Sequence, residues 1–153
     1  CEDIRGNLTV YEAVVLMMTA LGSLRCHDKS RVIPVGYSML LILYITLLRR
    51  TPEYNEEIRY HISFLPDVKV WTGNLLNVIL YIPLGGTIYN MAASIKGTAF
   101  AALLSSVLCE IIQYFTHRGV ADINDVLFNL IGACAGALLF RAFRAFKKKK
   151  DLQ

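Results

Sequence analysis

The sequence predicts an all-α fold, a polytopic transmembrane bundle of four to five helices with short loops. Apolar residues make up 55% of the 153 residues, and only 18% are charged. The mean hydropathy is +0.45, and the charges cluster in short runs between apolar blocks. Inside lipid, only helices and closed barrels satisfy their backbone groups. These blocks do not alternate as barrel strands do, so we expect one helical membrane domain.

The apolar blocks place the helices at residues 8–24, 33–48, 73–93, 98–116 and 123–144. The first block is short for a membrane span, so it either crosses with a tilt or lies at the interface.

Proline and glycine mark irregular points along these helices. Pro83 lies inside the third helix and predicts a kink, because it removes a backbone donor and clashes with the preceding turn. Gly85 and Gly86 are expected to loosen the next turn. Lys96 and Gly97 are expected to form a tight loop before the fourth helix.

The longest polar segment, residues 51–71, allows two interpretations. Tyr54, Ile58, Ile62 and Leu65 recur at helical spacing, which predicts a short amphipathic helix on the membrane surface, with Trp71 as an interfacial anchor. A plain solvated loop fits equally well.

Charge distribution predicts the topology. Six cations follow the last apolar block: Arg141, Arg144 and Lys147–Lys150. We interpret them as an anchor on anionic lipid rather than a nucleic-acid site. With five spans and this tail inside, the inner segments hold more Lys and Arg than the outer ones. The positive-inside rule then places the C-terminus in the cytoplasm and the loop between 98–116 and 123–144 outside.

That topology brings a set of polar residues to one depth. Each falls in the outer half of the membrane or at its outer face, although the charge count did not require it. The set comprises Arg50, Asn77, Glu110, Gln113, His117, Arg118, Asp122, Asp125 and Asn129.

Helical spacing sharpens this set. Glu110, Gln113 and His117 share one face of the fourth helix. On the fifth helix, Asp125 and Asn129 share a face with two glycines, Gly132 and Gly136. A Gly-x-x-x-Gly pair lets a neighbouring helix approach closely. We therefore expect Asp125 and Asn129 to point into the bundle.

Most of these residues also have a purely structural explanation. Asp122 and Asp125 match a helix N-cap and its N3 partner. His117 fits a surface histidine, Arg118 can extend to lipid headgroups, and Gln113 can join two helices.

Glu110 is the hardest of these residues to explain as structure alone. An ionised side chain at depth costs about 2.5–3.5 kcal/mol on insertion scales, so it should face a partner or water. Arg118 and Arg50 are the cations within reach. Alternatively, burial keeps the carboxyl protonated.

Several short motifs together resemble the VanZ-like family of small bacterial membrane proteins. They are Tyr44–Leu48 ending in Arg50; Asn74–Val78 followed by Ile82–Gly85; Glu110–Gln113; and Arg118, Asp122–Val126, Asn129, Gly132 and Gly136. No piece is specific alone, but their order and spacing are. The resemblance covers residues 37–140 and implies an integral membrane helical fold at residues 33–144. Residues 1–32 form an N-terminal helix and basic loop, and residues 145–153 a basic cytoplasmic tail.

The resemblance also implies a function. The family's namesake activity is low-level resistance to teicoplanin, a lipid-tailed glycopeptide that acts at the outer membrane face. The family's polar positions fall on residues already selected by depth: Asn77, Glu110, Gln113, Arg118, Asp122, Asp125 and Asn129. Pro83, Gly85, Gly132 and Gly136 are expected to be structural.

Three functions remain open at this point. The first is a non-catalytic protein of the bacterial cell membrane, whose outward-facing polar pocket binds membrane lipid, lipoglycopeptide or lipid-linked wall precursor. The second is an intramembrane enzyme, with Glu110 or Asp125 as base and Arg118 on phosphate. The third is a small transporter. No cofactor or metal is expected, since His117, Asp122 and Glu110 give only a weak metal signal. An oligomer is compatible with all three functions.

Overall fold

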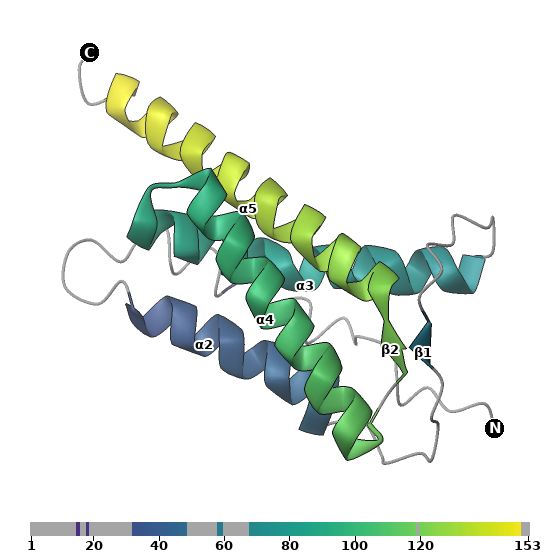
Figure 1. Cartoon of the computed structure of the whole chain (residues 1–153). Helices are drawn as coiled ribbons and strands as arrows, with labels where there is room; N and C mark the ends of the chain where they lie inside the picture. The colour runs from purple at the N-terminus through teal and green to yellow at the C-terminus, as the bar shows by residue number, and fades with distance from the viewer. Residues whose placement is uncertain are drawn as a thin grey trace.

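The computed structural model describes residues 15, 18, 32–48, 58–59, 68–118 and 120–150. Val15 and Met18 are helical, and the rest of the helix predicted at 8–24 lies outside the described residues, as does Arg50. The elements run in the order α2 Val32–Leu43, η2 Tyr44–Leu48, β1 Ile58–Arg59, α3 Val68–Ala92, α4 Ile95–Thr116, β2 Ala121–Asp122 and α5 Ile123–Lys150 (Figure 1). The η2 segment is a π-helical continuation of α2.

Three of the described helices are long and apolar enough to cross a membrane. They are Trp71–Ala92, Ile95–Thr116 and Ile123–Lys150, and Val32–Leu47 is a shorter apolar helix. The prediction of a helical, multi-pass membrane protein is confirmed at this level. No surface helix is found among the described residues, and of the first predicted helix they include only Val15 and Met18.

The segment 51–71 departs from the predicted surface helix. Ile58 and Arg59 instead form a short strand, β1, which pairs in parallel with Ala121 and Asp122 of β2. This pairing satisfies backbone groups that a helix would have satisfied locally. In addition, α3 begins at Val68, so Trp71 lies in its first turns, edge-on to Phe128 of α5. The remainder of the segment lies outside the described residues.

The turn between α3 and α4 is shorter than predicted. Ala93 adopts a left-handed backbone with φ 51°, which ends α3. Ser94 then caps α4, because its hydroxyl accepts a hydrogen bond from the Gly97 amide at 3.1 Å. Lys96 and Gly97 therefore belong to the first turn of α4, and their assignment to a loop was wrong. Pro83 is also inside α3, which remains helical through it.

Helix α5 is longer than the predicted 123–144. It continues through Lys147–Lys150, where the positive charges face the negative end of the helix dipole. Its C-terminal turns extend past the other helices in Figure 1. The basic segment is thus helical as far as Lys150 rather than a separate tail.

Close contact between α3 and α5 holds the centre of the bundle. A Cβ at Gly132 would meet the Val78 carbonyl, and one at Gly136 would meet the Ile82 carbonyl. On α3, Gly85 faces the α5 backbone in the same way. The close approach predicted for Gly132 and Gly136 is confirmed, and α3 is the neighbour. Gly85, expected to loosen its turn, is instead part of this contact.

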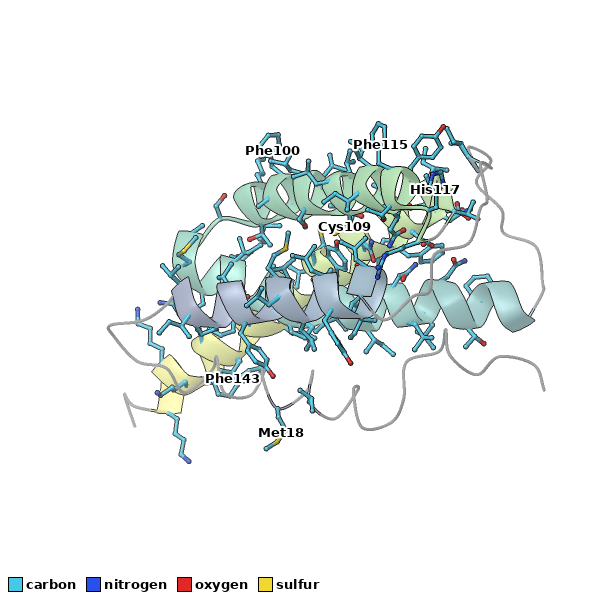
Figure 2. The ribbon with its side chains drawn as sticks, turned by 90° about the horizontal axis from the view of Figure 1, so that it is seen from below. Met18, Phe100, Cys109, Phe115, His117 and Phe143 are labelled. Atoms are coloured by element: carbon cyan, nitrogen blue, oxygen red, sulfur yellow. The ribbon has the colours of Figure 1, made fainter. Side chains whose placement is uncertain are left out.

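The outer and inner faces of α4 differ sharply. Phe100 and Phe115 are 69% and 75% exposed and point away from the bundle (Figure 2), which suits contact with lipid tails. The inner face packs on a buried core made of Ile42, Leu80, Tyr81, Leu84, Ile88, Ala102, Cys109 and Ala133.

The glycine contact predicts a difference between two Gly→Ala substitutions. Gly136→Ala should lower the free energy of unfolding by about 1–3 kcal/mol or more, because the methyl group overlaps backbone that must move. Gly73→Ala is the matched control, since nothing lies within 4 Å of its added Cβ. The control should be neutral or stabilise by up to about 1 kcal/mol. Thermal unfolding in detergent measures both, and equal melting temperatures would contradict the packing role.

Candidate functional site

Polar side chains from α3, α4, α5 and the α4–α5 connection meet at one end of the bundle. We call this group the polar cluster. A chain reversal creates it, because α4 ends and α5 begins there, beside the end of η2. The first half of α3 passes the same place. Its described members are Asn77, Glu110, Gln113, Arg118, Asp122, Asn124 and Asp125.

Asn77 and Asp125 join α3 to α5. The Asn77 amide donates to the Asp125 carboxylate, with Nδ2 and Oδ1 2.7 Å apart. Asp125 lies in the first turn of α5, where the helix dipole favours a negative charge. Both residues are half-buried. Asp125 therefore has an interhelical contact in addition to the first-turn position that the sequence predicted.

Glu110 is buried, with 8% of its surface exposed. Its Oε2 accepts a hydrogen bond from the backbone N–H of Asp122 at 2.9 Å. That N–H lies at the entrance to α5, where the partial charge of the helix dipole is positive. A carboxylate that accepts a backbone N–H makes a charge-assisted bond. The helix entrance thus helps to accommodate Glu110, a partner that the sequence analysis had sought in Arg118 or Arg50.

Asp122 caps α5 as predicted. Its Oδ1 accepts from the backbone N–H and from the side-chain Nδ2 of Asn124, each at 2.8 Å. Asn124 is buried, and the sequence analysis did not select it. Its position two residues after a predicted N-cap aspartate was the available signal.

Arg118 and Gln113 bind the C-terminal end of η2. Arg118 donates to the Leu47 carbonyl at 3.0 Å, and Gln113 donates to the Thr46 carbonyl at 3.4 Å. The last carbonyls of a helix lack partners within it, and a cation there is favoured by the dipole. These two side chains therefore connect α4 to the end of the shorter apolar helix.

His117 ends α4. It adopts a left-handed backbone with φ 52°, and its N–H bonds the Tyr114 carbonyl while the Arg118 N–H bonds that of Gln113. This pair of bonds is a Schellman motif, a common way to end a helix. His117 thus has a backbone role in ending α4.

Asn129 lies deeper, on the face of α5 that it shares with Gly132 and Gly136. Its Nδ2 donates to the Ser106 hydroxyl of α4 at 2.9 Å, and both residues are buried. The prediction that Asn129 points into the bundle is confirmed. The sequence analysis missed Ser106, although it lies one helical turn before Glu110 on the same face.

The weak metal signal finds no support in the described part of the chain. His117, Asp122 and Glu110 all lie there, and no three His, Cys, Asp or Glu side chains are grouped to hold a metal ion among the residues described.

The fold and the polar cluster define a helical, multi-pass membrane protein. The model of the VanZ/LLP1 family matches residues 9–144, which is most of the chain. This chain therefore belongs to the VanZ/LLP1 family. Comparisons with curated proteins and with solved structures gave no match.

The Asn77–Asp125 bond can be tested by exchanging its partners. Asn77→Asp places two carboxylates together and should destabilise the protein by about 1.5–3 kcal/mol, the value of a hydrogen bond to a charged group. The double variant Asn77→Asp/Asp125→Asn restores one amide and one carboxylate and should recover much of the loss. The measurement is thermal unfolding of the wild type, the single variants Asn77→Asp and Asp125→Asn, and the double variant. A double variant no more stable than Asn77→Asp would show that the contact contributes little.

Proposed function

We propose that this protein acts at the outer face of the bacterial cell membrane, without catalysis. In this proposal the polar cluster binds the polar part of an envelope amphiphile, and the result is lower susceptibility to teicoplanin-type lipoglycopeptides. The observation that carries the proposal is the convergence of polar side chains at one end of the bundle: Asn77 of α3, Glu110 and Gln113 of α4, Arg118 of the α4–α5 connection and Asp125 of α5.

The chemistry of the cluster supports binding more than catalysis. Asp125 accepts from Asn77, and Glu110 accepts the Asp122 N–H. Both carboxylates that an enzyme would use as base thus take part in contacts between segments. The cluster also combines anionic, amide and guanidinium groups, which suits a headgroup carrying both hydroxyl and charged groups.

Substitution at Glu110 tests the proposal in cells. Expression of the intact protein in a susceptible host should raise the minimum inhibitory concentration of teicoplanin. Glu110→Gln keeps an acceptor for the Asp122 N–H and should retain part of the effect. Glu110→Leu removes that acceptor and should abolish it.

Ile111→Val is the matched control for Glu110, because Ile111 is the next residue of α4 and is exposed on its surface. It should retain the full effect. Unchanged susceptibility with the intact protein, at verified expression, would refute the proposed role. Mass spectrometry of the lipid-linked wall precursors tests the enzymatic alternative. That alternative would be established if the intact protein alters these precursors and if both Glu110→Ala and Asp125→Ala abolish the alteration.

The proposal requires the polar cluster to face outward and the C-terminus to lie in the cytoplasm. Reporter fusions check this requirement. Green fluorescent protein joined after Gln153 should fluoresce, because it folds in the cytoplasm. Alkaline phosphatase inserted beside Val120, in the α4–α5 loop, should be active, because it folds outside. The reverse pattern would place the cluster on the inner face and exclude an action on external glycopeptide.

A further inference from the structure

A second group of polar side chains lies deeper in the bundle, beyond the polar cluster. Tyr81 of α3 is fully buried, and its hydroxyl lies beside Ser105, Ser106 and Cys109 of α4. Asn129 of α5 bonds the same Ser106. Cys109 lies in the space between α4 and α2 (Figure 2). Ser106 is about 15 Å from the end of α4 at 1.5 Å per residue, which is near the middle of a hydrocarbon core about 30 Å thick.

Hydrogen-bonding capacity in this region is not fully used. The Tyr81 hydroxyl and the Asn129 Oδ1 are buried, and neither has a hydrogen-bond partner of acceptable geometry among the described residues. The same is true of Gln113 Oε1, which belongs to the polar cluster and lies two helical turns after Ser106 on α4. Ser105 differs, because its hydroxyl donates to the Ala102 carbonyl. The unused atoms come from α3, α4 and α5, and they lie beside one inner face of α4.

Unpaired polar atoms are costly in the middle of a membrane. Lipid offers no hydrogen bonds to replace those of water, and buried polar groups nearly always have a partner, which is another protein group or an ordered water. Phenylalanine and leucine would fill comparable positions without that cost. Two of the three atoms are amide oxygens, which only accept hydrogen bonds, and the third, a phenol, both donates and accepts. Their natural complement is a group that carries O–H donors.

We propose that Tyr81, Ser106 and Asn129 form an internal binding site for hydroxyl groups, supplied by water or by a glycerol-bearing lipid headgroup. The guest donates to Asn129 Oδ1 and accepts from, or donates to, the Tyr81 hydroxyl. Gln113, a member of the polar cluster, lies on the same face of α4 as Ser106 and connects this site with that cluster. The inference stands apart from the proposed role in glycopeptide susceptibility, since it requires only that the interior be occupied.

Solid-state NMR of the full chain in nanodiscs containing phosphatidylglycerol tests the site. The experiment measures how fast magnetisation passes to Tyr81 carbons from water protons and, separately, from glycerol headgroup protons. Tyr81→Phe assigns the signal by its loss. Tyr89→Phe is the matched control on the same helix, since Tyr89 packs edge-on against Phe140.

We expect build-up at Tyr81 to be several-fold faster than at Ala137, which is fully buried on α5. Fast transfer from water identifies water as the guest, and fast transfer from glycerol protons identifies lipid. Asn129→Leu should slow the Tyr81 build-up several-fold.

Build-up at Tyr81 as slow as at Ala137 from both sources would overturn the site. If a variant fails to fold, the Asn129 side-chain amide of the wild type provides the same measurement. If magnetisation passes rapidly from water to Tyr81 but the intact protein does not raise the minimum inhibitory concentration of teicoplanin, the proposed function is refuted and the internal site is not.

Discussion

Backbone contact between α3 and α5 is the constraint on which the other features depend. Gly132 and Gly136 present no side chain where the carbonyls of Val78 and Ile82 approach, so the backbones of α3 and α5 pack directly against each other. In lipid, where hydrophobic burial contributes little to helix association, such close packing is a main source of stability. The same approach fixes α5 in rotation. Asp125 and Asn129, on the glycine face, therefore point to α3 and α4 rather than to lipid.

The polar cluster connects elements that the glycine contact does not reach. Arg118 and Gln113 bind the end of η2, while Glu110 binds the entrance to α5. Each bond pairs a side chain with a backbone group left open at a helix end, where the chain cannot satisfy it locally. The same hydrogen bonds thus complete the helix ends and hold the polar cluster together. The proposed binding role would therefore use the same residues as this structural role, and separating the two requires conservative substitutions.

Hydropathy and spacing predicted the helical class, the bounds of α4 within a few residues, the start of α5 and the inward face of α5. Those properties follow from local periodicity. Partners were harder to predict, because they depend on tertiary contacts. Glu110 was expected to face a partner such as Arg118 or Arg50, or water, or to be protonated, and the backbone N–H of Asp122, twelve residues away, was not foreseen as a partner. The strand at Ile58 was not predicted, because two residues that pair with a distant segment are too few to show a periodic pattern in the sequence. Ser106 was not predicted, because a single serine inside an apolar helix gives no sequence signal of its partner.

The length of α5 has a mechanical consequence. Its 28 residues span about 42 Å at 1.5 Å per residue, more than a hydrocarbon core of about 30 Å. One rigid element therefore carries Asp125 near one end and Lys147–Lys150 at the other. A helix longer than the local bilayer tilts or projects, and cations prefer to remain at anionic headgroups. A change in bilayer thickness or in surface charge at the lysine end would change the tilt of the whole helix. It would thereby displace Asp125 relative to the opposite leaflet.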